Sequence, residues 1–173
     1  MRFCGATLHT NNTCTFKVWA PLKETVTLHL INPPSQIDLI KDDDGYFSAT
    51  VENISNEADY LFTVDESRRL PDPASHYQPQ GVHGASRVVN HSAFKWNDAS
   101  WKGIPLSDLV LYEIHVGTFT PDGTFEAIIP RLNDLSSVGI NAIELMPVSQ
   151  FPGNRNWGYD GVFPYAVQQS YGG

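Results

Sequence analysis

Hydrophobic and polar positions alternate with a period of two between residues 13 and 64. The stretches TCTFKVWAP and TVTLHLI each keep their apolar side chains on one face, and the pattern resumes after the polar turn Lys41-Asp42-Asp43-Asp44-Gly45. Alternation of this kind is typical of half-buried strands separated by turns. The apolar positions are Phe16, Val18, Val26, Leu28, Leu30, Phe47, Ala49, Val51, Tyr60, Phe62 and Val64. The pattern predicts a β-sandwich of short strands.

The acidic run in residues 42–44 allows a second interpretation as a cation site. Its spacing is not that of an EF-hand loop, and no Glu follows at the required offset. Asp and Gly also accept the backbone angles that turns require. We therefore interpret the run as a solvated turn.

Residues 65–107 lose this periodicity and are rich in proline, glycine and serine. The large apolar side chains of Phe94, Trp96 and Trp101 predict an ordered connector that packs against both neighbours, rather than a free linker. The histidines in this region, at positions 76, 83 and 91, do not have a metal-ligand spacing. We interpret them as hydrogen-bonding loop histidines.

The pattern changes again after residue 108. The apolar run from Leu109 to Tyr112 predicts a parallel strand buried on both faces, and residues 140–146 predict a second strand that ends at Pro147. Apolar residues between them recur at steps of three and four, as in an amphipathic helix. A strand, a helix and a strand in this order favour a parallel sheet with a helix packed on it.

Three residues set the expected limits of that helix. Thr124 is suited to the N-cap, and Gly139 to the position that follows the helix. Pro130 lies inside the apolar pattern and predicts a kink or a later helix start, because proline has no backbone N–H to donate. The polar residues Glu113 and His115 fall within or just after the first strand, where burial would require hydrogen-bond partners.

An aromatic loop follows the second strand, in the sequence PVSQFPGNRNWGYDGVFPYAVQQSYGG. Ligands of parallel α/β folds gather at the carboxyl ends of strands, so this loop lies on the functional face if the strand is parallel. The loop contains Arg155, Asn156 and Asp160 among its aromatic residues, which are Phe151, Trp157, Tyr159, Phe163 and Tyr165. Rings stack on the apolar faces of sugars and polar groups bind their hydroxyls, although a lid over the core has the same composition. Glu144, a lone acid on the second strand, is interpreted as structural.

Composition narrows the function classes. The length of 173 residues allows one ordinary domain or two small ones, and 41% hydrophobic and 17% charged residues are typical of a globular protein. The formal net charge is -8. The chain has no basic run, so nucleic acid is not an expected partner. Cys4 and Cys14 have no metal spacing, and we expect two reduced thiols. The sequence has neither a signal peptide nor a membrane-spanning run, so a cytoplasmic protein without membrane contact is expected.

Several long motifs resemble the α-amylase family of glycoside hydrolases (family 13), and within it the trehalose-releasing members. The motifs are LYEIHVGTFTPDGTF, ELMPV and FPGNRNWGYDGV, and the likeness continues upstream through PDPASHYQPQGVHGASRVV and FKVWAP. The chain departs from the family at His76, Ala85 and Pro130. The resemblance implies an immunoglobulin-like sandwich of the family 48 carbohydrate-binding type (1–90), a connector (91–107) and the truncated start of a (β/α)8 TIM barrel (108–173), namely its first βαβ unit.

The resemblance also implies roles for the aromatic loop. Tyr159 would stack on the sugar in the subsite where the bond is cut, and Asp160 would line the same subsite. Trp157 and Arg155 would shape its rim, with Asn156 among the substrate-binding residues. The implied substrate is a maltooligosyl-trehalose or another α-glucan, cut by a retaining mechanism at the α-1,4 bond next to the terminal trehalose. No metal or cofactor is implied.

The same resemblance implies that this chain lacks the catalytic residues. In the family, the nucleophile Asp, the acid/base Glu and a further Asp follow the fourth, fifth and seventh barrel strands, and the sequence stops soon after the second. We therefore expect the chain to be inactive alone and to expose an unfinished sheet edge, including Ile143 and Leu145, that favours association. Two alternatives stay open: a non-catalytic glucan-binding or interaction module, and part of a glycogen branching or debranching enzyme. The Asp after Tyr159 favours the trehalose-releasing members.

Overall fold

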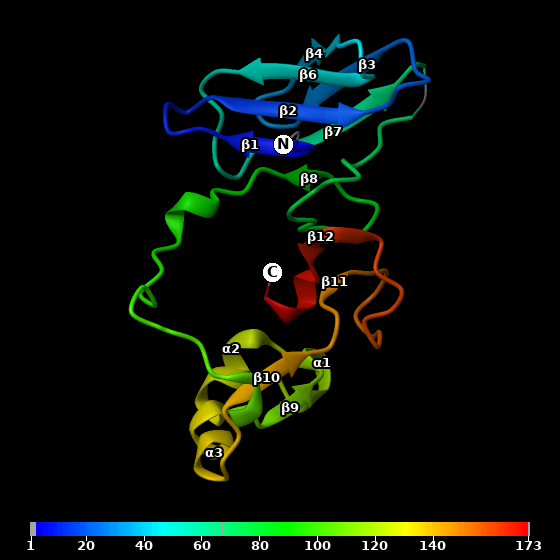
Figure 1. Cartoon of the computed structure of the whole chain (residues 1–173). Helices are drawn as coiled ribbons and strands as arrows, with labels where there is room; N and C mark the ends of the chain where they lie inside the picture. Colours follow the sequence, from blue (N-terminus) through cyan, green and yellow to red (C-terminus); the bar gives the residue numbers. More distant parts are fainter. Residues whose placement is uncertain (1–2, 67, 173) are drawn as a thin grey trace.

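The computed structural model describes residues 3–66 and 68–172, and two four-stranded antiparallel sheets form its upper part (Figure 1). The first sheet has the order β1-β2-β6-β5, with β1 Gly5–Leu8, β2 Cys14–Trp19, β6 Tyr46–Val51 and β5 Ile40–Lys41. The second has the order β4-β3-β7-β8, with β4 Ser35–Asp38, β3 Val26–Leu30, β7 Asp59–Val64 and β8 Ser86–Arg87. Strands β1 and β8 were not predicted from the sequence.

The two sheets share one hydrophobic core, so this part is a β-sandwich. Phe16 of the first sheet and Tyr60 of the second meet edge to face, with ring centroids 4.9 Å apart. Both side chains are almost completely buried, as are Leu28, Phe47 and Phe62. The alternation read from the sequence is confirmed here, because the residues predicted to face inward form the core. Gly45 closes the predicted turn at φ 83°, and the Asp42 carboxylate accepts the N–H groups of Asp44 and Tyr46.

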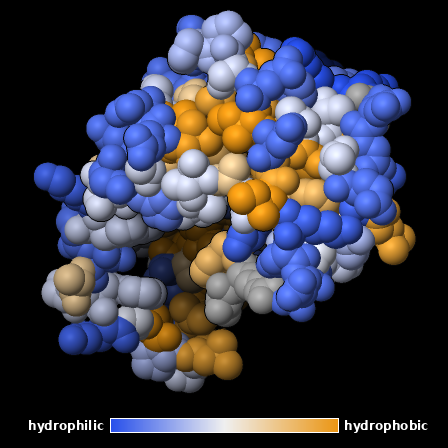
Figure 2. All heavy atoms as spheres, turned by 90° about the horizontal axis from the view of Figure 1, so that it is seen from above, coloured by the Kyte–Doolittle hydropathy of each residue, from blue (hydrophilic) through white to orange (hydrophobic). Residues whose placement is uncertain are grey.

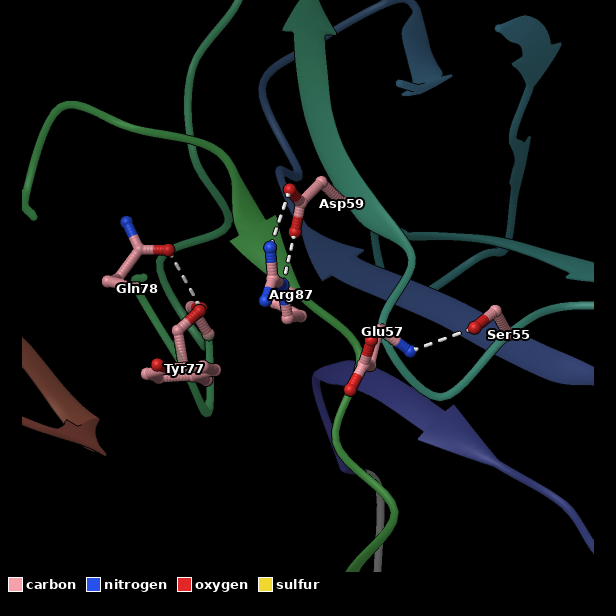
Figure 3. Close-up of polar contacts among 7 residues, drawn as sticks. Ser55, Glu57, Asp59, Tyr77, Gln78 and Arg87 are labelled. Atoms are coloured by element: carbon pink, nitrogen blue, oxygen red, sulfur yellow. Dashed lines mark hydrogen bonds and ion pairs between the residues drawn. The ribbon is translucent and has the colours of Figure 1, made fainter. Parts of the chain in front are cut away.

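The segment from residue 70 to residue 88 lacks long strands but is tightly attached to the sandwich. Asp72 is fully buried and its Oδ2 accepts a 2.8 Å hydrogen bond from the Tyr60 hydroxyl. Arg87 on β8 binds Asp59 on β7 through two hydrogen bonds of 2.7 and 3.0 Å (Figure 3). The β-sandwich (residues 5–88) therefore includes the first part of the region expected to be a connector.

The second part of that region, residues 89–108, contradicts the predicted packing. It contains two short 3-10 helices, η1 His91–Ala93 and η2 Leu106–Asp108. Phe94, Trp96 and Trp101 are 65%, 76% and 70% exposed, and the first two rings contact one another. The prediction was wrong because apolar composition signals a need for a covering surface, and the described part of the chain does not provide one at these rings.

The predicted strand–helix–strand unit is present below the sandwich, as the βαβ unit (residues 111–145). Strand β9 (Leu111–Ile114) pairs in parallel with β10 (Ala142–Leu145). Between them lie α1 Val116–Phe119, α2 Phe125–Ile128, η3 Ile129–Arg131 and α3 Leu132–Ser137. The Thr124 hydroxyl caps α2 by accepting the N–H of Ala127, a 3-10 turn interrupts the helix at Pro130, and Gly139 follows it at φ 92°. These three predictions are confirmed.

The prediction that this first strand is buried on both faces was wrong. Leu111 and Tyr112 are 57% and 42% exposed, and on the helical side Ile129 and Val138 are exposed as well. A parallel strand is buried when it has neighbours on both edges and helices on both faces. Here β9 and β10 form a sheet of two strands, so both have an open edge within the described residues.

A hairpin of β11 (Ser149–Gln150) and β12 (Phe163–Val167), followed by η4 (Gln169–Tyr171), lies between the β-sandwich and the βαβ unit (Figure 1). Phe151 and Tyr171 form a second small core with Ile114, Val116 and Ile128. Seen from the sandwich end, hydrophobic atoms gather in the middle of the visible face with hydrophilic atoms around them (Figure 2). Within residues 3–66 and 68–172, no helix is long and apolar enough to cross a membrane.

Candidate functional site

An open cavity of about 650 Å³ lies at the carboxyl ends of the two parallel strands. His115 directly follows β9 and Met146 directly follows β10, so both strands deliver a side chain to it. The remaining lining residues come from the turn after β9 and from the aromatic loop: Gly117, Thr118, Asn154, Arg155, Asn156 and Trp157. Carboxyl ends of parallel strands are where α/β folds place their ligands.

His115 fastens the aromatic loop to the end of β9. Its Nε2 lies 2.6 Å from the backbone oxygen of Asn156, and its Nδ1 lies 3.3 Å from Thr118 Oγ1. A carbonyl oxygen only accepts, so Nε2 carries a hydrogen, and in the neutral ring Nδ1 accepts from the Thr118 hydroxyl. The Tyr171 hydroxyl is 3.4 Å from the same Nε2. The histidine thus holds one wall of the cavity in place.

Asn156 organises the loop from within. Its Oδ1 accepts the N–H of Gly158 at 2.7 Å and the N–H of Asp160 at 3.4 Å, and its Nδ2 donates to Asp160 Oδ2 at 2.8 Å. Gly158 has φ 101°, and a Cβ at this position would collide with the backbone oxygen of Pro147. The loop can therefore fold back on the end of β10 only with glycine at this position.

The five predicted binding residues fall into two groups. Arg155, Asn156 and Trp157 line the cavity. Tyr159 and Asp160 are exposed and are not among its lining residues, although Asp160 is one hydrogen bond away through Asn156. Trp157 and Tyr159 are 78% and 70% exposed, so both rings present an open face to solvent. Their assignment to a sugar subsite stays a prediction.

Sequence reasoning missed the part that β9 contributes. His115 was expected only to need partners, whereas it also lines the cavity with Thr118. The available signal was its place directly after a predicted parallel strand. The carboxylates Glu113 and Glu144 stand opposite one another in the strand register, are exposed and do not line the cavity.

Two of the three loop histidines form a hydrogen bond, as predicted. His76 Nδ1 and His91 Nε2 form a hydrogen bond of 2.8 Å. Burial, followed by the nearby His91, lowers the pKa of His76. Within the described part of the chain, no group of three or more His, Cys, Asp or Glu residues is placed to hold a metal ion. Cys4 and Cys14 are free thiols, and burial raises the pKa of Cys14 to about 12.

Comparison with known sequences finds relatives named malto-oligosyltrehalose trehalohydrolase. The chain is 47% identical over 159 residues to the malto-oligosyltrehalose trehalohydrolase of Saccharolobus solfataricus, and 41% identical over 160 residues to that of Arthrobacter ramosus. These matches cover 92% and 91% of the chain but 28% of each relative, so the chain spans less than a third of their length. A glucan branching enzyme from Bacillus caldolyticus is 29% identical over 177 residues, covering 91% of the chain and 27% of that enzyme. No family model matches.

Comparison with solved structures points to the same group of folds. A Salmonella typhimurium protein described as a candidate α-amylase superposes with a TM-score of 0.92 at 37% identity, over 99% of this chain and 29% of that protein. The pullulanase of Anoxybacillus sp. LM18-11, solved with maltotetraose, superposes with a TM-score of 0.82 at 25% identity, over 97% of this chain and 29% of the pullulanase. Neighbours in the α-amylase family thus share both the β-sandwich and the βαβ unit with this chain.

Proposed function

Because the chain is homologous to part of the malto-oligosyltrehalose trehalohydrolases, we propose that it is the substrate-holding portion of such an enzyme. The reaction of the complete enzyme would be hydrolysis of the α-1,4 bond next to the terminal trehalose of a maltooligosyl-trehalose. The observation that carries the proposal is the cavity at the carboxyl ends of β9 and β10, with Arg155, Asn156 and Trp157 in its wall. We place the protein in the cytoplasm as part of the same proposal.

The fold proposal rests on the same homology. Residues 1–90 would be an immunoglobulin-like domain of the family 48 carbohydrate-binding type, 91–107 a connector, and 108–173 the beginning of a (β/α)8 barrel. The superposition on a candidate α-amylase and the parallel pairing of β9 with β10 support this division. A complete barrel takes about 250 residues, far more than this chain devotes to it.

The substrate proposal gives the loop residues separate tasks. The exposed rings of Trp157 and Tyr159 would stack on glucose units, and Asp160, held by Asn156, would accept hydrogen bonds from sugar hydroxyls. Arg155 would donate hydrogen bonds at the rim. That the pullulanase was solved with a bound maltotetraose supports an α-glucan as the ligand class.

We propose that the catalytic carboxylates belong to sequence beyond this chain. A retaining glycosidase needs two carboxyl groups about 5–5.5 Å apart, one as nucleophile and one as acid/base. The described residues that line the cavity include neither Asp nor Glu. Binding without cleavage is therefore the expected behaviour of this chain alone.

The open strand edges provide a further expectation, which is association. Within the described residues, β9 and β10 each pair with a strand on one edge only, and exposed apolar side chains such as Leu111 and Leu145 lie beside the open edges. Such edges pair readily with another chain. The occupant we propose is a polypeptide that carries the remaining strands of the barrel.

A chimera tests the proposed function. The segment of the Saccharolobus solfataricus relative that matches this chain would be replaced by residues 3–172, and maltotriosyl-trehalose would be supplied. We expect the chimera to release trehalose and the 173-residue chain alone to release none. Trp157→Ala in the chimera should lower kcat/KM by about tenfold to a hundredfold, because positioning is lost.

The controls separate this function from its two alternatives. A folded chimera that transfers glucan branches or cleaves α-1,6 bonds instead would support a branching or debranching enzyme, although the 29% identity to the branching enzyme is well below 47%. An inactive but folded chimera, together with binding of maltotetraose by the chain, would support a non-catalytic glucan-binding module. Release of trehalose by the chain alone would contradict the proposal that it lacks the catalytic residues.

A further inference from the structure

One outward-facing position of the β-sandwich is buried although it is polar. Leu28 and Leu30 on β3 belong to the core, so His29 between them points to the opposite face of its sheet. It is nevertheless only 7% exposed. Its neighbours across the strands are Gln36 on the edge strand β4 and Leu61 on β7. Neighbouring residues therefore cover the His29 side chain on this face of the sheet.

The ring of His29 is satisfied on one side only. Its Nε2 lies 2.8 Å from Thr63 Oγ1, on the neighbouring strand β7. Its Nδ1 is buried and has no hydrogen-bond partner among the residues that the structure describes. Native proteins rarely leave such a nitrogen unpaired, because it has lost its hydrogen bonds to water and gained none in return.

A cavity of about 240 Å³ opens beside this histidine. Three segments that are distant in the sequence line it: His29 and Leu30 of β3, the turn and strand residues Pro34, Ser35 and Gln36, and Arg69. Arg69 precedes Leu70, which pairs with Phe62 of the core, so the arginine side chain falls on the outward face with His29. The pairing of Leu70 with Phe62 thus brings Arg69 to the same face of the sheet as His29.

The charges around the cavity favour an anion. Burial lowers the pKa of His29 first, the Arg69 cation lowers it further, and the Asp38 carboxylate opposes both with a smaller effect. Asp38 directs Oδ1 to the Thr27 hydroxyl, from which it accepts a 2.8 Å hydrogen bond. The described lining contains one cation and no carboxylate. Of these two charges the Arg69 cation has the larger effect on His29, although the chain as a whole carries a formal net charge of -8.

We propose that this cavity binds a phosphate group, either free phosphate or the phosphate monoester of a small sugar. The Arg69 guanidinium supplies the planar pair of donors that matches phosphate oxygens. The Ser35 hydroxyl and the Gln36 amide add neutral donors. With Thr63 donating to Nε2, the neutral His29 ring carries its hydrogen on Nδ1 and donates it to the anion, which satisfies the unpaired atom. The site is separate from the proposed glucan cavity and does not depend on the proposed function.

Nuclear magnetic resonance on the ¹⁵N-labelled 173-residue chain tests the site. The ring nitrogens of His29 and the amides of Ser35 and Gln36 would be followed at constant ionic strength, while inorganic phosphate, glucose 6-phosphate or glucose is added. We expect saturable shifts with either phosphate compound. Arg69→Gln should weaken the affinity by at least about tenfold, and the neighbouring Arg68→Gln, which removes the same charge outside the cavity lining, by no more than about twofold.

Each outcome has a defined meaning. Tighter binding of glucose 6-phosphate than of inorganic phosphate supports a sugar phosphate as ligand, and equal affinity supports a free phosphate group. Saturation by glucose alone, shifts that Arg69→Gln leaves unchanged, or no shift up to about 20 mM phosphate would each overturn the proposal. Arg69 is exposed, so its replacement should leave the remaining amide spectrum unchanged and keep the test readable.

Discussion

The β-sandwich and the βαβ unit are built from equally clear sequence patterns and yet bury their apolar residues to very different degrees. In the sandwich, Phe16 and Leu28 are 0% exposed. In the βαβ unit, Leu111 is 57% and Val138 is 74% exposed. Strands form in both regions, with regular pairing.

The difference separates two properties that usually occur together. Local pattern and backbone pairing are enough to define a strand, whereas burial depends on a second layer that covers it. The sandwich contains both of its layers. The βαβ unit has a two-stranded sheet and the short helices α1, α2, η3 and α3 between its strands. The small core around Phe151 and Tyr171 attaches it to the hairpin of β11 and β12.

The largest expected effect comes from truncating a buried apolar residue in the sandwich and an exposed one in the βαβ unit. Phe16→Ala should lower the free energy of unfolding by about 3–5 kcal/mol, because it removes a fully buried ring and leaves a cavity. Leu111→Ala should change it by less than about 1 kcal/mol, because that side chain is mostly in water. Urea unfolding followed by far-ultraviolet circular dichroism measures both. Equal losses would mean that Leu111 is covered in solution.

The next effect is a pH dependence confined to the sandwich. Burial raises the pKa of Asp72 to about 6, against the lowering effect of hydrogen bonds from Ala74 and Tyr60. Between about pH 4 and pH 6 the folded state keeps this proton while the unfolded state loses it, so stability falls as the pH rises, by about 3 kcal/mol in total. Asp72→Asn should remove this decline.

Urea unfolding of both proteins at several values between pH 4 and pH 7 measures that prediction. The difference between wild type and Asp72→Asn isolates this group from the other carboxylates. If both proteins lose stability in parallel over this range, Asp72 does not titrate as expected.

A smaller effect tests whether the aromatic loop after β10 is held as rigidly against Pro147 as the side chains of the sandwich are held in their core. Gly158→Ala should cost about 2–3 kcal/mol of local stability, because alanine at φ 101° is strained and its Cβ meets the Pro147 carbonyl. Gly153→Ala is the matched control, since Gly153 has φ 80° with open space around it, and should cost about 1 kcal/mol. Hydrogen exchange of the loop amides measures both. Similar costs would show that the loop can shift away from Pro147.

The smallest effect concerns the exposed connector. His91→Ala removes the 2.8 Å hydrogen bond to His76 and should reduce overall stability by less than about 0.5 kcal/mol. Because the pKa of His76 is lowered in the folded state, the stability that neutral His76 contributes is present above the ordinary pKa of histidine. That stability is lost as the pH falls below the ordinary value. Amide exchange in residues 89–93, corrected for intrinsic rates, should be faster at pH 5.5 than at pH 7.5 in the wild type. His91→Ala should show a smaller difference, because burial, the larger cause of the lowered pKa of His76, remains.

Most of the fold could be predicted from local chemistry. The alternation through Phe16 and Tyr60, the cap at Thr124, the interruption at Pro130 and the end at Gly139 each depend on a residue and its near neighbours. Such signals are readable because they act over a few residues. The short strand β8 was missed, because its two residues are placed by the Asp59–Arg87 ion pair and not by a pattern of their own.

The candidate site was predictable only in part. The loop residues Arg155, Asn156 and Trp157 were found from composition and motif. His115 was not chosen, because its role depends on a 2.6 Å contact with a residue 41 positions away. The exposure of Trp96 and Trp101 was also beyond reach, since a sequence shows that a ring is apolar but not which surface covers it.

The placement of the tryptophans has a spectroscopic consequence. All four indoles are more than half exposed, at 58% for Trp19, 76% for Trp96, 70% for Trp101 and 78% for Trp157. The emission of the native chain should therefore already resemble that of indole in water and should move little when the phenylalanine- and tyrosine-filled core unfolds. Three of these four rings lie on the connector and the cavity rim, where a ligand or a second polypeptide would shield them and change the emission.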